Sequence, residues 1–145
     1  MKKSLVVFLI MLQISISLYG CSNSSDGVDV DIDLSELSMT LIEAEYQRIV
    51  SNSEEYKGKT IKLYGSYQAM QIDNDGNVAH FIIVIPGDEC CQMGFEFKRD
   101  ESYSFPDDYP SQNSMILITG KLDKHERFGA SYTYIDVNEF TVVSS

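Results

Sequence analysis

The adjacent thiols of Cys90 and Cys91 are the residues of this sequence best suited to chemistry. A disulfide between chain neighbours is strained, because their Cα atoms lie about 3.8 Å apart whereas disulfides usually span roughly 4.4 to 6.8 Å. Such strain makes a disulfide easy to reduce, which suits redox chemistry. In a regular strand the two side chains face opposite ways, with Cys91 toward the core. The sequence favours an inert, partly buried pair and leaves redox chemistry and metal binding open.

A zinc site at this pair needs further ligands, and the two histidines, His80 and His125, are the natural candidates, together with Asp88 and Glu89. The pair does not match zinc-finger spacing, because adjacent cysteines lack the separation of a C-x-x-C motif. Zinc binding therefore requires the fold to bring these residues together. Otherwise both histidines are expected to be solvated.

The other polar clusters predict no catalytic site. The run Asp73–Asn77 resembles a calcium loop, but aligning it on Gly76 puts Gln71 at the first ligand and Ile82 where a bidentate glutamate is required. It predicts a hairpin turn instead. The serine, histidine and aspartate residues show no nucleophile-elbow context. We therefore expect a protein that is not an enzyme.

Five aromatic residues are the candidates for ligand binding. Aromatic rings in a long loop and on a barrel face offer stacking platforms for sugars or apolar ligands. Loops rich in Phe and Tyr also pack back on their own core, and the sequence favours that interpretation without excluding the first. The five residues are Tyr103, Phe105 and Tyr109 in a loop and Tyr132 and Tyr134 in the last predicted strand.

One helix and five strands are expected to position these residues. The segment Thr40–Glu43 has the spacing of a capping box and predicts the start of the helix. The apolar face of this helix is predicted to hold Ile42, Tyr46, Ile49 and Val50. The predicted strands are Thr60–Met70, Val78–Ile85, Cys91–Lys98, Met115–Leu122 and Ser131–Val143, with a loop over Arg99–Asn113 and a turn at Arg127–Ala130.

Five strands with a long connection between the third and the fourth predict a mainly β fold: a five-stranded OB-like barrel preceded by one N-terminal helix. A weak internal repeat supports this, because Ile61–Gly65 and Ile116–Gly120 both end an aliphatic strand on glycine. A strongly bent barrel strand needs glycine at such a point. Alternation in the third strand places Phe95 and Phe97 on an apolar face and Glu96 on a polar one.

The first 21 residues carry the most specific motif. Lys2 and Lys3 precede an apolar run, which is the layout of a secretory signal and is too short to span a membrane comfortably. The following Leu18–Cys21 resembles the bacterial lipobox. The resemblance implies cleavage before Cys21 and acylation of this residue with a diacylglyceryl group and a further chain such as palmitate, which anchors stably. The alternatives are an ordinary signal peptide with an incidental cysteine, or an uncleaved anchor.

Processing at Cys21 predicts a lipoprotein on the extracytoplasmic face of the cell membrane. Residues 1–20 are the expected signal peptide, 21–37 a flexible acidic tether, and 38–145 the barrel domain, although the alternation at Val28–Asp33 also permits a short edge strand. The mature chain keeps 9 basic against 22 acidic residues, a formal charge of −13. This charge excludes nucleic acid as a partner and repels anionic headgroups, so membrane attachment is expected through lipid alone.

Two segments resemble known lipoproteins. Tyr56–Gly65 is similar to the start of OB-fold domains in small bacterial lipoproteins of the tRNA-anticodon-like group. Cys90–Phe97 resembles a paired-cysteine motif of uncharacterised Firmicute-type extracytoplasmic proteins. The resemblance implies the fold and no activity. We expect a membrane-anchored module that binds a protein or small molecule without a cofactor; the alternative is a thiol redox or zinc-handling accessory lipoprotein that uses Cys90 and Cys91.

Overall fold

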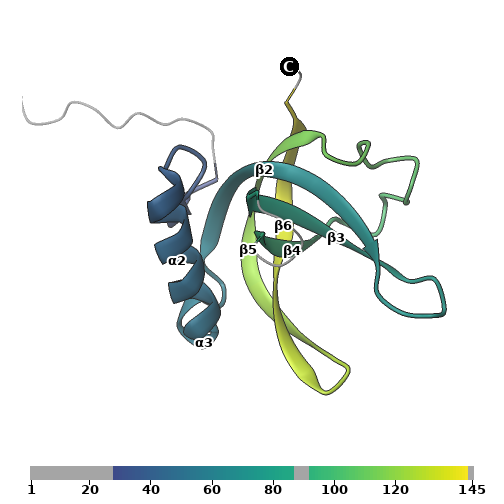
Figure 1. Cartoon of the computed structure of the whole chain (residues 1–145), viewed down its shortest axis with the longest axis horizontal. Helices are drawn as coiled ribbons and strands as arrows, with labels where there is room; N and C mark the ends of the chain where they lie inside the picture. The colour runs from purple at the N-terminus through teal and green to yellow at the C-terminus, as the bar shows by residue number, and fades with distance from the viewer. Residues whose placement is uncertain (1–27, 87–91, 144–145) are drawn as a thin grey trace, which may run out of the picture.

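The computed structural model describes residues 28–86 and 92–143, which form a β-barrel with two helices along one side (Figure 1). Neither helix in these ranges has the length and apolar character needed to cross a membrane. The elements in chain order are β1 (Ile32–Asp33), α2 (Met39–Ser51), α3 (Ser53–Tyr56), β2 (Thr60–Gln71), β3 (Val78–Ile85), β4 (Met93–Lys98), β5 (Met115–Arg127) and β6 (Ala130–Val142).

The barrel strands follow the order β2-β3-β4-β6-β5, and the pairing of β5 with β2 closes the ring. Strands β4 and β6 pair in parallel, while the other barrel neighbours are antiparallel. This arrangement confirms the predicted mainly β fold with a five-stranded OB-like barrel after an N-terminal helix.

Two glycines, Gly65 and Gly120, allow β2 and β5 to bend into the barrel, although both lie in the middle of their strands and not at the strand ends that the sequence predicted. A Cβ atom on Gly65 would lie 2.3 Å from the carbonyl oxygen of Ile83, and one on Gly120 would lie 2.3 Å from that of Asp136. Both glycines sit where β2 and β5 pair with each other. The close contacts are with the next strands, because the backbone of β3 approaches Gly65 and that of β6 approaches Gly120 so closely that no side chain fits.

The helix α2 packs its predicted apolar face on the barrel core. Ile42 and Ile49 are buried, and the ring of Tyr46 meets that of Phe95 edge-on at 5.0 Å. Val50 differs from the prediction, because it is largely exposed at the end of the helix. Buried aliphatic and aromatic side chains from all five barrel strands complete the core.

The predicted capping box is wrong. The helix begins at Met39, and Ser38 occupies the N-cap without a side-chain capping bond. Its carbonyl oxygen accepts from the amides of Leu41 and Ile42. Thr40 therefore lies within the first turn, where its hydroxyl cannot act as the N-cap.

Part of the region expected to be a tether is paired with the barrel. Ile32 and Asp33 form the parallel edge strand β1 beside β2, which is the alternative that their alternating pattern left open. The Asp31 carboxylate accepts from the Thr60 amide at 2.7 Å, and Leu34 is only 2% exposed. Burial of Leu34 explains why the chain is held here. Residues 21–27 of the predicted tether lie outside the described residues.

Strand β5 runs five residues beyond its predicted end and forms a long hairpin with β6. Charged residues at Asp123–Arg127 resemble a turn in sequence, but they pair with Ala130–Tyr134. The turn itself consists of Phe128 and Gly129, with φ angles of 54° and 76°. Positive φ at both positions is typical of a two-residue hairpin turn that matches the strand twist.

Hydrogen bonds anchor two further connections, the turn between β2 and β3 and the loop between β4 and β5. Asp73 accepts from the backbone amides of Asp75 and Asn77, which confirms the predicted hairpin turn. In the loop that follows β4, the Gln112 side chain both donates to and accepts from the backbone of Ala69. This loop therefore lies along the C-terminal half of β2 instead of extending into solvent.

Candidate functional site

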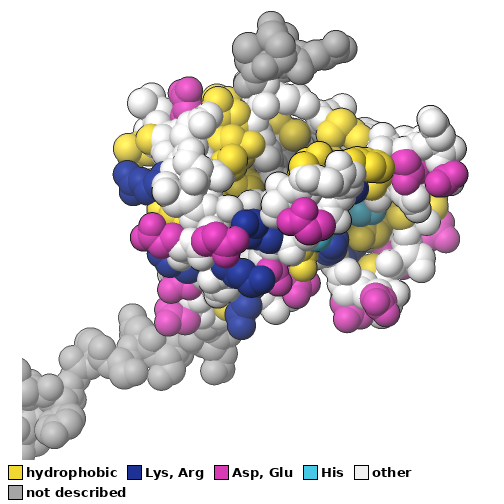
Figure 2. Space-filling model, turned by 90° about the horizontal axis from the view of Figure 1, so that it is seen from below, with side chains coloured by type: hydrophobic (Ala, Val, Ile, Leu, Met, Phe, Trp, Pro, Cys, Tyr) yellow, Lys and Arg dark blue, Asp and Glu magenta, His cyan; other side chains and the backbone are white. Residues whose placement is uncertain are grey.

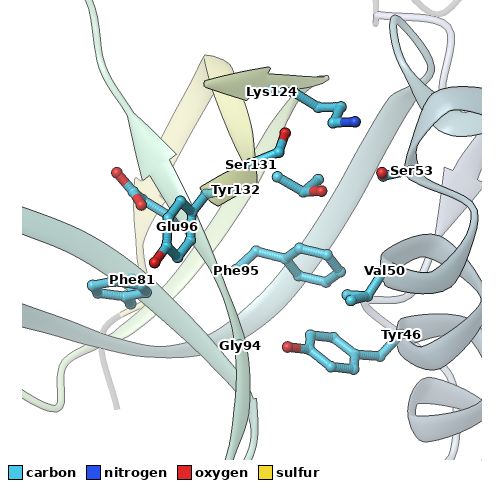
Figure 3. Close-up of a pocket in the computed structure, with 11 residues that line it drawn as sticks. Tyr46, Val50, Ser53, Phe81, Gly94, Phe95, Glu96, Lys124, Ser131 and Tyr132 are labelled. Carbon is cyan, nitrogen blue, oxygen red and sulfur yellow. The ribbon is translucent and has the colours of Figure 1, made fainter. Parts of the chain in front are cut away.

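A pocket of about 310 Å³ lies between α2, β4 and the β5–β6 hairpin (Figure 3). Phe95 lies at its centre, with Tyr46 and Val50 of α2 on one side and Tyr132 of β6 on another. The remaining lining residues are Ser53, Phe81, Gly94, Glu96, Lys124, Ser131 and Thr133.

The wall at β4 is built around a buried ion pair between Glu96 and Arg127. Glu96 is only 7% exposed, and both of its carboxylate oxygens accept from Arg127, at 2.8 and 3.2 Å. In Figure 3 the Glu96 carboxylate points away from Phe95 and Val50. Two-point geometry of this kind fixes orientation as well as charge. The pair therefore attaches the hairpin, which carries Arg127, to the outer surface of β4.

Two further ion pairs connect the base of the hairpin to α3 and to the residue that follows it. Lys124 Nζ lies 2.6 Å from Glu54, and Lys57 Nζ lies 2.9 Å from Asp123. Figure 2 shows the molecule from below, and acidic and basic side chains are interspersed on the face seen in this view. Exposed pairs contribute little stability, because water screens them. Their effect is to neutralise the rim of the pocket on the side of Lys124.

His125 lies beside the buried pair in its neutral form. Its ring stacks on that of Tyr134 at 5.2 Å. Burial lowers the pKa of His125, Glu96 opposes this effect, and Lys98 and Arg127 reinforce it. Nε2 lies 3.5 Å from a Glu96 oxygen, and this buried atom has no hydrogen-bond partner among the described residues. Because the separation is long and the lowered pKa favours the uncharged ring, this contact is weaker than an ion pair.

His80 belongs to an aromatic cluster that is separate from the pocket. It stacks on Tyr109 at 4.0 Å, and its Nδ1 lies 2.9 Å from the Tyr67 hydroxyl. Burial raises the pKa of Tyr67 to about 12, so this hydroxyl remains protonated and can donate to Nδ1. Burial lowers the pKa of His80, while Glu96 raises it and Arg99 lowers it further. The cluster joins the loop after β4 to the barrel.

The five aromatic residues predicted to bind a ligand divide between the surroundings of His80 and those of His125. Tyr103, Phe105 and Tyr109 gather around His80 and Arg99, whereas Tyr132 and Tyr134 flank His125. Of the five, only Tyr132 lines the pocket.

The two histidines therefore do not share a site. No group of three or more His, Cys, Asp or Glu suited to a metal ion occurs within residues 28–86 and 92–143. Cys90 and Cys91 lie outside the described residues, so their redox or zinc-binding role stays a prediction. Cys21 lies outside them as well.

Sequence reasoning missed Glu96, Arg127, Lys124 and Tyr46 as site residues. Alternation placed Glu96 correctly on the outer face of its strand, but it could not show that the hairpin covers that face. The only local signal was the run of alternating charge at Asp123–Arg127, which a turn does not require.

No protein-family model matches the chain, and no curated protein matches it in sequence.

The Glu96–Arg127 pair leads to a first prediction. Arg127→Met leaves a buried carboxylate without its partner, so the free energy of unfolding should fall by on the order of 2 kcal/mol, less than for a fully enclosed pair because Arg127 keeps 19% exposure. The double variant Glu96→Gln with Arg127→Met should regain much of this loss. Urea unfolding measures both. Arg48→Met breaks an exposed pair with Glu45 and should change stability by less than about 0.5 kcal/mol. If Arg127→Met and Arg48→Met lowered the free energy of unfolding equally, this account would be contradicted.

The burial of His80 leads to a second prediction. Because the pKa of His80 is lowered in the folded protein, the unfolded chain takes up the proton first as pH falls. The stability contribution is therefore complete above a pH of about 6.5 and is lost as pH decreases toward the folded pKa. His80→Phe should reduce the loss of unfolding free energy between about pH 7 and 5, in wild-type and His125→Gln backgrounds alike. NMR titration of the His80 ring checks the direction, and a pKa above 6.5 would refute it.

Proposed function

We propose that the protein is a lipid-anchored, extracytoplasmic binding module that holds a small ligand in the pocket between α2, β4 and the β5–β6 hairpin. The observation that carries this proposal is the pocket itself, whose volume of about 310 Å³ falls at the lower end of the range for small-molecule sites. Its lining combines aromatic rings with a few polar groups, the composition expected of such sites.

The rigidity of the pocket walls supports a binding role. The walls come from three separate parts of the chain, and each is fixed before a ligand arrives. Tyr46 packs on Phe95 within the core, while Arg127 attaches the hairpin to Glu96. A pocket that is already ordered loses little conformational entropy when it is filled.

The state of the charged groups supports binding over catalysis. The Glu96 carboxylate is held at both oxygens by Arg127, and Lys124 is paired with Glu54. A general acid or base must be free to exchange a proton with its substrate. Neither of these two lining residues has that freedom.

The lipobox supports the membrane anchor. Ten residues separate Cys21 from Ile32 of β1, so β1 lies within roughly 40 Å of the Cys21 backbone, even for a fully extended chain. The formal charge of −13 after processing leaves lipid as the means of attachment to an anionic membrane.

The anchor leads to a third prediction. Cys21→Ala removes the acylated thiol, so the variant should lose radiolabelled palmitate and leave the membrane fraction. Cell fractionation with metabolic labelling measures both. Cys90→Ser is the matched control, because it removes a thiol that the lipobox does not include, and it should keep both the label and the membrane location. A Cys21→Ala protein that remains labelled would overturn the lipoprotein assignment.

The pocket leads to a fourth prediction. Fragments of mixed chemistry, screened by NMR against the purified protein in detergent, should shift the amide signals of Tyr46, Gly94 and Tyr132. Tyr132→Ala removes one aromatic wall and should weaken the best fragment at least tenfold. Tyr103→Ala, an exposed aromatic outside the pocket, should leave binding unchanged. If no fragment of any class shifts these signals, the binding function is wrong.

A further inference from the structure

We infer that the ligand of this pocket is a neutral saccharide of one or two rings. The inference rests on the proposed function, because it names the ligand class of the same site. Three properties of the lining carry it: its charges are paired, its largest surfaces are aromatic, and its remaining polar groups are hydroxyls.

The paired charges favour a neutral ligand. Among the described lining residues, the charged side chains are Glu96 and Lys124. Glu96 already accepts two hydrogen bonds from Arg127, and Lys124 lies 2.6 Å from Glu54. A cationic ligand would have to break the buried Glu96–Arg127 pair to gain a counter-charge, which is costly. An anionic ligand would have to displace Glu54 from Lys124, against the repulsion of a chain with a formal charge of −11.

The aromatic rings suit the apolar face of a sugar ring. Four aromatic rings line the pocket (Figure 3): Phe81 and Tyr132 lie beside Glu96, and Phe95 lies toward Tyr46. Tyr132 is 38% exposed, and the Arg127 guanidinium lies 4.8 Å from its ring centre, which holds the ring in place. Exposed aromatic rings bury a large apolar area at little cost in conformational entropy. The C–H face of a pyranose offers a matching flat surface.

The hydroxyl groups distinguish a sugar from a purely apolar ligand. Ser53 lies on α3, and Ser131 and Thr133 lie on β6, so hydroxyls reach the pocket from two sides. Each hydroxyl both donates and accepts, as do the hydroxyls of a sugar. An apolar ligand would cover these groups without replacing their bonds to water, which carries a penalty for each group. A ring with one apolar face and a polar edge satisfies both parts of the lining.

Calorimetry with matched sugars tests the ligand class. The probes are N-acetylglucosamine, glucose and maltose, compared with cationic glucosamine and anionic glucuronate, using the purified lipoprotein in a detergent without a sugar headgroup. At least one neutral sugar should bind, at least tenfold more tightly than its charged counterpart. Tyr132→Ala should weaken that binding at least tenfold, while Tyr103→Ala should leave it unchanged.

Val50→Trp provides a second variant in case the loss of Tyr132 disturbs the hairpin. Val50 lines the pocket from an exposed helix position, so a larger side chain should fill the cavity without affecting the core, and it should abolish sugar binding. If charged sugars bind as tightly as neutral ones, or if only fragments of another class occupy the pocket, the saccharide inference is wrong and the binding module stands. If no compound enters the pocket, both are wrong.

Discussion

The buried ion pair between Glu96 and Arg127 is the interaction on which the rest of the site depends. Beyond the last deeply buried pair, Leu122 with Ile135, the β5–β6 hairpin has no barrel core to rest on. A carboxylate that is 93% covered requires a partner, and the hairpin supplies it only when it lies against β4. Burial and pairing are therefore interdependent: the pairing of β6 with β4 brings the hairpin beside Glu96, and Arg127 binds the carboxylate that the hairpin covers. The pocket is the space that remains between this attached hairpin and α2.

The features that the sequence predicted well are those with a local physical cause. A period of two along β2 and β5 reflects one face packed on the core, and Gly65 and Gly120 mark places where backbones touch. The predicted start of α2 was less accurate, because Ser38 and Thr40 are both residue types found at the N-cap and the choice between them depends on how the chain enters the helix from β1.

The features that it missed depend on contacts between distant segments. Strand alternation assigns Glu96 to the outer face, and an outer face is normally solvated; that it is covered follows from the length of β5. The charged residues that extend β5 lower its hydrophobic signal, so the strand seemed to end at Leu122. Likewise, Tyr132 was a candidate because it is aromatic, but only the fold brings Tyr46 and Phe95 to the same cavity. His80 likewise joins its aromatic cluster through a contact between segments that are distant in sequence, because it stacks on Tyr109 of the loop after β4.

The pairing of β1 with β2 also fixes the point at which the described chain joins the barrel. In a protein held through Cys21, the pull of the anchor enters the barrel at Asp31 and β1, next to the start of α2. The 13 residues of α2 span about 20 Å, and Val50 and Ser53 lie at or just beyond its far end. The helix thus acts as a spacer between the point of attachment and the pocket. If the proposed anchor at Cys21 holds the protein, the pocket would lie beside the end of α2 that is farther from the point of attachment.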